Sequence, residues 1–255
     1  MSIGDIKNEL KNILQEDMDG LTAFVKKYEN DERTGVIATV EQAKKKIRHI
    51  EDEILRSKKM LEFEHKYIDM GYEYICGIDE VGRGPLAGPV VSCAVILPKN
   101  ELILYLNDSK QLSKKKREEL YDIILEKAVA YGIGIVSERR IDEINILQAT
   151  YEAMRMAIHN LKVKPDILLN DAVKIPEVDI KQVPIIKGDT LSATIAAASI
   201  VAKVTRDRMM EEYDKIYPGY DFASNKGYGS AKHYEGLDAN GPCDIHRRTF
   251  IKEYV

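Results

Sequence analysis

Two adjacent carboxylates, Asp79 and Glu80, follow directly after the apolar segment of residues 74–78. An ionised carboxylate beside a hydrophobic core is unfavourable unless a metal ion, a cation or hydrogen bonds compensate its charge. The turn Gly82-Arg83-Gly84 comes next, and a second apolar segment follows it. Glycines allow a ligand to approach the main chain closely. The pattern therefore predicts a strand, a charged site and a ligand-facing turn in succession.

Two more acids end apolar segments later in the chain. Asp171 ends the segment DILLND, and Asp189 ends PIIKGD just before a helix rich in small residues. If these segments are neighbouring strands, their ends bring the carboxylates to one edge of a sheet. Oxygen ligands without histidine suit hard cations such as Mg²⁺ or Mn²⁺, and a pair of such ions can activate water for phosphodiester cleavage. Each acid could instead be a turn residue or a helix N-cap, which is a common role of aspartate.

The surrounding sequence predicts the elements that hold these acids. Residues 1–71 have apolar residues at helical spacing among many charges. They are expected to form a helical N-terminal extension, either a structural cap or an arm that contacts nucleic acid or a partner. Residues 72–255 alternate strand and helix patterns, which predicts an α/β domain with a mixed sheet flanked by helices. Within it, Ser113 is the expected N-cap of a helix over residues 114–131.

Composition and charge set broad limits. The chain has 255 residues, of which 44% are hydrophobic and 31% charged, as is typical of a globular protein with a full core. The net charge of −4 counts mildly against a nucleic-acid binder but allows a local basic track. No apolar run approaches the roughly 20 residues that span a bilayer, and no signal-peptide pattern is found, so cytoplasmic residence is expected. The three cysteines suggest neither a disulfide framework nor a zinc site.

The motif GIDEVGRGPLAGPVV at residues 77–91 resembles the signature of ribonuclease HII, the type 2 ribonucleases H. The likeness continues through most of residues 72–250, in the segments DSKQLS (108–113), LLNDA (168–172), KGDTLSATIAAASIVAKVTRDRMM (187–210), NKGYGSAKH (225–233) and GPCDIHRRTF (241–250). The resemblance implies the ribonuclease H-like fold, with a mixed five-stranded sheet and helices on both sides. It also implies that Asp79, Glu80, Asp171 and Asp189 are the metal-binding acids.

By the same resemblance, the substrates are RNA–DNA hybrids, cut in the RNA strand, and duplex DNA cut 5′ of a single embedded ribonucleotide. The cut, assisted by Mg²⁺ or Mn²⁺, leaves a 3′-hydroxyl and a 5′-phosphate. Gly82, Arg83 and Gly84 are expected to read the ribose, and Tyr228 to stack on the adjoining sugar. Lys110 is the first candidate phosphate contact. Further candidates are Lys187, Lys203 and Arg206. Each of these cations could equally be a solvated surface charge or the partner of an intramolecular salt bridge. The chain is expected to act as a monomer, with any replication or repair partner unknown.

Three alternatives remain. A type 3 ribonuclease H shares the fold and chemistry, but has a strand-rich N-terminal domain and lacks the glycine-flanked tyrosine. A non-catalytic nucleic-acid binder on the same scaffold would lack one or more acids. A nucleotide-binding protein would use GRGPLAG as its phosphate loop, but this segment lacks the G-x-x-x-x-G-K-[ST] pattern. His233 and His246 are expected to be structural, because metal-assisted hydrolysis needs no histidine base.

Overall fold

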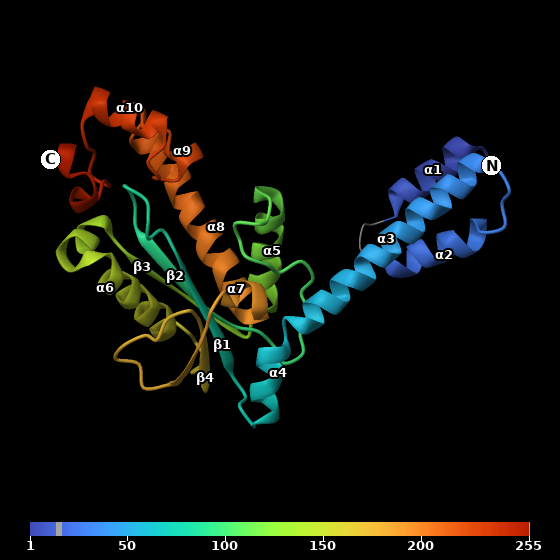
Figure 1. Ribbon diagram of the computed structural model, residues 1–255, viewed down its shortest axis with the longest axis horizontal. Coiled ribbons are helices and arrows are strands. Elements are labelled where there is room, and N and C mark those ends of the chain that lie inside the picture. The colour runs from blue at the N-terminus through green and yellow to red at the C-terminus, as the bar shows by residue number, and fades with distance from the viewer. Residues whose placement is uncertain (14–16, 255) are drawn as a thin grey trace. The chain divides into compact units, whose positions relative to one another are not determined.

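The computed structural model describes residues 1–13 and 17–254. The chain divides into two compact units, Met1–Lys59 and a larger unit from Met60 onward. Each unit buries a set of apolar residues of its own (Figure 1). None of the helices in the described ranges combines the length and the apolar character needed to cross a bilayer.

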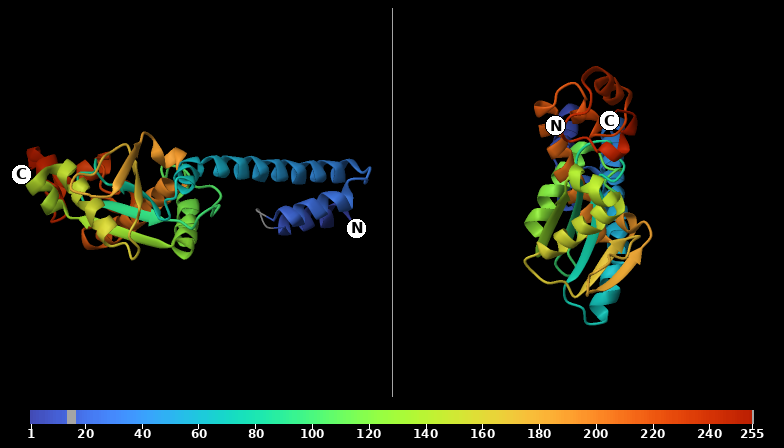
Figure 2. Two further views of the ribbon diagram at one scale, coloured as in Figure 1. Left: turned by 90° about the horizontal axis from the view of Figure 1, so that it is seen from below. Right: turned by 90° about the vertical axis from the view of Figure 1, so that its left-hand side faces the viewer.

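Three helices form the first unit: α1 (Ile3–Asn12), α2 (Met18–Tyr28) and α3 (Thr34–Lys59). A capping box begins α1, because the Ser2 hydroxyl accepts from the Asp5 N–H at 3.1 Å and the Asp5 carboxylate accepts from the Ser2 N–H at 2.9 Å. Both α1 and α2 pack on α3 (Figure 2). The core of this unit is formed by apolar residues of the three helices, among them Ile6, Leu10, Leu21, Phe24, Val36 and Val40. The expected helical N-terminal region is confirmed.

The second unit is built on a five-stranded sheet in the order β3-β2-β1-β4-β5. Its strands are β1 (Ile75–Val81), β2 (Val90–Ile96), β3 (Ala130–Val136), β4 (Ile167–Asp171) and β5 (Lys181–Ile185). The central strand β1 pairs antiparallel with β2 and parallel with β4, so the sheet is mixed (Figure 1).

Helices cover both faces of this sheet, which confirms the expected fold class. The helices of this unit are α4 (Glu62–Asp69), α5 (Lys114–Lys127), α6 (Glu138–His159), α7 (Gly188–Leu191), α8 (Ala193–Ile216), α9 (Phe222–Asn225) and α10 (Ala231–Asn240), followed by the 3₁₀ turns η1 (Arg248–Phe250) and η2 (Lys252–Tyr254). Alternate residues of β2 point to opposite faces. Cys93 and Val95 pack with α8, whereas Ala94 and Ile96 pack with α6.

Glycines in the sheet let α6 and α8 approach it closely. A Cβ atom at Gly134 of β3 would lie 1.9 Å from the Ala153 carbonyl oxygen of α6. A Cβ atom at Gly77 of β1 would lie 2.1 Å from the Thr194 carbonyl carbon of α8. Side chains do not tolerate contacts this short, so glycine at these positions sets the distance between the helices and the sheet.

The helix after Ser113 is shorter than the sequence predicts. The Ser113 hydroxyl accepts from the Lys116 N–H at 3.2 Å and caps α5 as expected. The helix ends at Lys127 rather than at residue 131, because β3 begins at Ala130. Residues 130 and 131 therefore belong to the sheet, where the pairing with β2 satisfies their main-chain groups.

The boundary between the two compact units falls after Lys59, whereas the sequence predicts a boundary at residue 71. The segment in between contains α4, which is helical like the N-terminal unit. However, Tyr67 of α4 packs with Ile75 and Ile167 of the sheet. The helical pattern of residues 60–69 thus continues that of the extension, while their apolar side chains belong to the core of the second unit.

Gly134→Ala is expected to lower the free energy of unfolding by about 1–3 kcal/mol, because the new methyl group must displace α6 from a filled core. Urea unfolding followed by circular dichroism measures the change. Gly4→Ala in α1 is the control, since its Cβ atom would meet nothing closer than the Ser2 hydroxyl oxygen at 3.5 Å. Equal stability of Gly134→Ala and the unmodified protein would contradict the close approach of α6.

Candidate active site

Asp79 and Glu80 lie in the last part of β1, where the central strand leaves the core. The Asp79 side chain is only 7% exposed, and its Oδ1 accepts from the Glu80 N–H at 2.7 Å. The hydroxyl of Ser199, from α8, also hydrogen-bonds the Asp79 carboxyl group. Successive strand residues point to opposite sides, so the strand presents one carboxylate toward α8 and the other toward the exposed edge.

The pairing of β1 with β4 brings Asp171 to the same edge. Ile78 lies opposite Asn170, so the residues that follow them on the two neighbouring strands, Asp79 and Asp171, lie close to each other. The Asp171 Oδ1 atom accepts from the Gly188 N–H at 2.8 Å. That bond connects the end of β4 to the turn that carries Asp189, the fourth predicted acid. The structure thus brings together all four acids, which lie as much as 110 residues apart (79 to 189) in the chain.

Burial, together with repulsion between neighbouring carboxylates, raises the pKa values of three of these acids. Burial raises the pKa of Asp79 well above its ordinary value, and the charges of Glu80 and Asp171 raise it further. Burial also raises the pKa of Glu80, against the favourable charge of Arg83. Burial raises the pKa of Asp189 to about 6, with contributions from Asp108 and Asp171. A cation placed among the acids would relieve this repulsion.

The donor set fits a hard divalent cation, because it consists of carboxylate oxygens alone. Within residues 1–13 and 17–254, no three His, Cys, Asp or Glu side chains already stand close enough to enclose an ion. The acids share one edge of the sheet, and the charges of Glu80 and Asp171 contribute to the raised pKa of Asp79. The residues that would hold it are Asp79, Glu80, Asp171 and Asp189.

The predicted ribose-reading turn lies beside these acids. Gly82 has a φ of +92°, a conformation that favours glycine. The Arg83 Nη1 atom is 3.3 Å from the Glu80 Oε1 atom, so its side chain partly neutralises this acid. A Cβ atom at Gly84 would lie 3.5 Å from Cε1 of Tyr228, whose side chain is 45% exposed. The turn and the tyrosine ring, from segments far apart in sequence, therefore face each other.

Lys110 also lies among the site residues. Burial lowers its pKa, but the negative charges of Asp108, Asp79 and Asp189 outweigh that effect and raise it on balance. The side chain is exposed. It remains a cation at neutral pH and can approach a phosphate next to the carboxylates.

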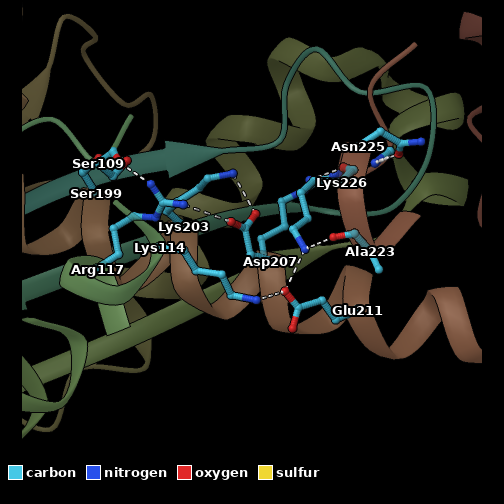
Figure 3. A network of polar contacts seen from close by, with 12 residues as sticks. Ser109, Lys114, Arg117, Ser199, Lys203, Asp207, Glu211, Ala223, Asn225 and Lys226 are labelled. Carbon is cyan, nitrogen blue, oxygen red and sulfur yellow. Dashed lines mark hydrogen bonds and ion pairs between the residues drawn. The ribbon is translucent and has the colours of Figure 1, made fainter. Parts of the chain in front are cut away.

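Two other candidate phosphate contacts are engaged within the protein. The Lys203 Nζ atom is 2.7 Å from the Asp207 carboxylate, in the network of Figure 3. Arg206 is fully buried and donates to main-chain carbonyl oxygens, so its prediction as a phosphate contact is wrong. Lys187 has a positive φ of 57° and caps α7. Lys110 is the candidate whose surroundings include the site acids.

The network of Figure 3 covers the polar side of α8. Glu211 accepts from Lys114 at 2.6 Å and from Lys226 at 2.8 Å, and Arg117 lies 4.0 Å from Asp207. These ion pairs connect α5, α8 and the segment that precedes Tyr228. The ion pairs hold the charged side of α8 against α5 and against the segment that precedes Tyr228.

The sequence analysis missed residues that support the acids. Ser109 and Ser199 are buried, and their hydroxyl oxygens are 3.0 Å apart, which extends the hydrogen bonding of Asp79. The negative charge of Asp108 contributes to the raised pKa of Asp189. Both Asp108 and Ser109 belong to the segment DSKQLS, from which the sequence analysis selects Lys110 alone as a candidate site residue. A cluster of small polar residues with no helical or strand pattern was the signal that could have indicated them.

Comparison with known proteins agrees with this geometry. The model of the family described as Ribonuclease HII matches residues 76–253, and that of the Ribonuclease HII N-terminal domain matches residues 2–68. The chain belongs to the ribonuclease HII family. A ribonuclease HII of Lachnoclostridium phytofermentans is 59% identical over 99% of this chain and 97% of its own. The resemblance inferred from the motifs is thereby confirmed.

Solved structures of ribonucleases H share the fold. The ribonuclease H2 of Pyrococcus horikoshii has a TM-score of 0.59 and 28% identity, over 70% of this chain and 94% of its own. A mutant of Bst-RNase HIII has a TM-score of 0.55 over 71% of this chain and 68% of its own, at 17% identity, and shows the shared fold alone. Both likenesses support the ribonuclease H-like architecture, and the type 2 family is the one whose sequence this chain shares.

Asp189→Asn is expected to stabilise the metal-free protein above pH 6. The folded state holds the Asp189 proton more tightly than the unfolded chain, so the free energy of unfolding falls as the pH rises from 3.8 to about 6. The asparagine side chain does not titrate, so the variant should keep the free energy of unfolding that the wild type loses. The difference in free energy of unfolding between the variant and the wild type should shrink below pH 4, where the wild-type carboxyl is protonated. Urea unfolding in a chelating buffer measures it, with exposed Asp122→Asn as control. A less stable Asp189→Asn at pH 7.5 would contradict the repulsion.

Proposed function

We propose that this ribonuclease cleaves the RNA strand of RNA–DNA hybrids and cuts 5′ of single ribonucleotides in duplex DNA. The observation that carries the proposal is the edge formed by Asp79, Glu80, Asp171 and Asp189, where buried like charges require a cation. Family membership supports a ribonuclease of type 2, and the choice of substrate rests on the residues around these acids.

The four acids would hold Mg²⁺ or Mn²⁺ against the scissile phosphate. Bound there, the ions lower the pKa of a water molecule and stabilise charge on the leaving oxygen. The chain's own contribution is to fix the carboxylates: the N–H of Gly188 orients Asp171, and the hydroxyl of Ser199 orients Asp79. If the water molecule attacked the phosphorus in line with its bond to the 3′ oxygen, cleavage would leave a 3′-hydroxyl and a 5′-phosphate.

The turn and Tyr228 would select the sugar. The 2′-hydroxyl is the group that distinguishes RNA from DNA. The main-chain groups of Gly82, Arg83 and Gly84 can approach a ribose because no Cβ atom blocks the two glycines. The Tyr228 ring, exposed opposite Gly84, offers a flat surface for the adjoining sugar. Lys110 would hold a phosphate beside the acids.

A type 3 ribonuclease H is the alternative with the same chemistry. Its N-terminal domain is expected to be rich in strands, whereas residues 3–12, 18–28 and 34–59 of this chain are helical. A non-catalytic binder is disfavoured because all four acids are present and share one edge. A phosphate loop formed by GRGPLAG is disfavoured because the segment leads into β2 rather than into a helix.

Asp79→Asn is expected to reduce cleavage by about a thousandfold or more, as the loss of one essential charge-stabilising group does. The assay uses duplex DNA with one internal ribonucleotide, with Mg²⁺ and Mn²⁺ in separate reactions, and circular dichroism confirms folding. Exposed Asp122→Asn is the control and should cleave normally. Retained cleavage by highly purified Asp79→Asn would refute the assignment of this acid.

Tyr228→Ala is expected to reduce cleavage at a single ribonucleotide about tenfold more than cleavage of a long RNA–DNA hybrid, which corresponds to about 1.4 kcal/mol. Only the first substrate depends on recognising the sugar at one junction. Tyr228→Phe separates the ring from its hydroxyl, and Tyr131→Ala, exposed on β3, is the control. An equal loss on both substrates would argue against junction recognition.

A further inference from the structure

Arg247 is a fully buried cation that contacts carbonyl oxygens rather than acids. Within the described ranges, no carboxylate oxygen lies within 4.0 Å of its guanidinium. Its Nε donates to the Gly88 carbonyl at 2.9 Å, its Nη1 to the Arg83 carbonyl at 2.9 Å and its Nη2 to the Gly82 carbonyl at 2.5 Å. A single side chain thus holds the main chain at both ends of the turn that follows the catalytic strand.

A second buried guanidinium, that of Arg206, holds the same turn from α8. It donates to the carbonyl oxygens of Pro89 at 2.8 Å, Ala87 at 2.9 Å and Lys226 at 2.8 Å. Burial lowers the pKa of Arg206 to about 10, and burial together with the charge of Arg206 lowers that of Arg247 to about 9. Apolar residues often stabilise such an interior more than buried charges do. The two arginines are therefore better explained by the conformation they impose than by stability.

That conformation exposes main-chain donors. In a trans peptide, the N–H points away from the carbonyl of the same plane. Because the carbonyls of Gly82 and Arg83 face Arg247, the N–H groups of Arg83 and Gly84 face the opposite side, where both residues are exposed. For neither N–H is an acceptor found in the part of the chain that the structure describes. Both can donate to a sugar or a phosphate.

The residue next to Arg247 fixes Tyr228. The Cys243 N–H donates to Nδ1 of His246 at 2.9 Å, so the proton of His246 lies on Nε2. From there it is donated to Nε2 of His233 at 2.9 Å, and Nδ1 of His233 donates to the Tyr228 carbonyl at 2.9 Å. Burial lowers the pKa of both imidazoles, that of His246 to about 4, which keeps this neutral chain of bonds intact.

Main-chain hydrogen bonds complete the connection between the Gly82–Gly84 turn and the loop that carries Tyr228. The Arg247 N–H donates to the Leu86 carbonyl at 2.9 Å, and the Leu86 N–H donates to the Gly227 carbonyl at 2.8 Å. The C-terminal segment, the turn and the tyrosine loop are therefore joined in series. These bonds fix the position of the Tyr228 ring relative to Gly84, whose Cβ position lies 3.5 Å from Cε1 of the ring.

We propose that Arg247 is a positioning residue for recognition of the ribonucleotide junction, acting with the His246–His233 pair to fix the position of the Tyr228 ring relative to the Gly82–Gly84 turn. The proposal rests on the proposed function, in which the turn and the ring together contact the sugars at the junction. It assigns a role in selectivity to residues that touch neither the substrate nor the metal-binding acids.

The test compares kcat/KM on duplex DNA containing one ribonucleotide with kcat/KM on the same duplex containing four in a row. Arg247→Lys keeps the charge but cannot reach three carbonyls, because an ammonium lacks the planar fork of donors. It is expected to lower the ratio roughly tenfold, since small misplacements of binding groups have effects of this size or larger. Arg139→Lys, exposed on α6, is the matched control and should keep the wild-type ratio.

Two variants of His246 test the hydrogen-bonded His246–His233 pair without changing a charge. His246→Leu removes the bond to His233 and is expected to lower the ratio, whereas His246→Gln can still donate to His233 and should keep it. In a Tyr228→Ala background, Arg247→Lys and His246→Leu should lower the ratio no further, because the group they position is gone. If Arg247→Lys fails to fold, the comparison of His246→Leu with His246→Gln still tests the proposal.

Failure of the proposed function and failure of the proposed role of Arg247 give different experimental results. If the wild-type protein cleaves neither substrate, the proposed function is wrong. If it cleaves both, while folded Arg247→Lys and His246→Leu keep the wild-type ratio or lose activity equally on the two substrates, the role of Arg247 is refuted. A thermal shift on adding Mg²⁺ that is equal in all these variants shows that the acids are undisturbed.

Discussion

The structure depends above all on keeping like-charged carboxylates together at the end of a buried strand. Asp79 is held in the interior by sheet pairing on both sides of β1 and by the hydroxyl of Ser199. Asp171 is placed beside it by the parallel pairing of β4 and fixed by the N–H of Gly188. None of these contacts removes the repulsion, which burial intensifies. The fold therefore maintains a cluster of acids whose repulsion a bound cation would relieve.

A second set of buried charges lies behind the neighbouring turn, and it has the opposite sign. Arg206 and Arg247 hold carbonyl oxygens, so the N–H groups of the turn face outward. The acids would bind the ions that cut, and the arginines would shape the surface that selects the sugar. Buried charges of both signs thus lie around the end of β1, beside clusters of buried apolar residues.

Helix α8 connects these two parts. It lies close on β1 because Gly77 has no side chain, and it carries Ser199 toward Asp79 and Arg206 toward the turn. Farther along its polar side, ion pairs with α5 and with Lys226 fix the helix near the tyrosine loop. A shift of α8 would therefore alter the metal-binding acids and the sugar-selecting turn together.

The sequence predicts the parts of the site that have a local pattern. Asp79, Asp171 and Asp189 each end an apolar segment, and the alternation of strands and helices predicts the mixed sheet. The roles of Arg206 and Arg247 have no such pattern, because an arginine in a charged segment is indistinguishable from a surface residue until the carbonyls around it are known. The same holds for α4, whose helical pattern matches the N-terminal unit while Tyr67 packs into the second.

The proposed chemistry requires that the four acids bind divalent cations. Isothermal titration calorimetry of Mn²⁺ into metal-free protein, with Mg²⁺ as competitor, tests it most directly when wild type is compared with Asp171→Asn. The account predicts saturable binding by the wild type, displaced by Mg²⁺ and greatly weakened in Asp171→Asn. Equal binding by the two proteins, or no binding by the wild type in the presence of substrate duplex, would contradict it.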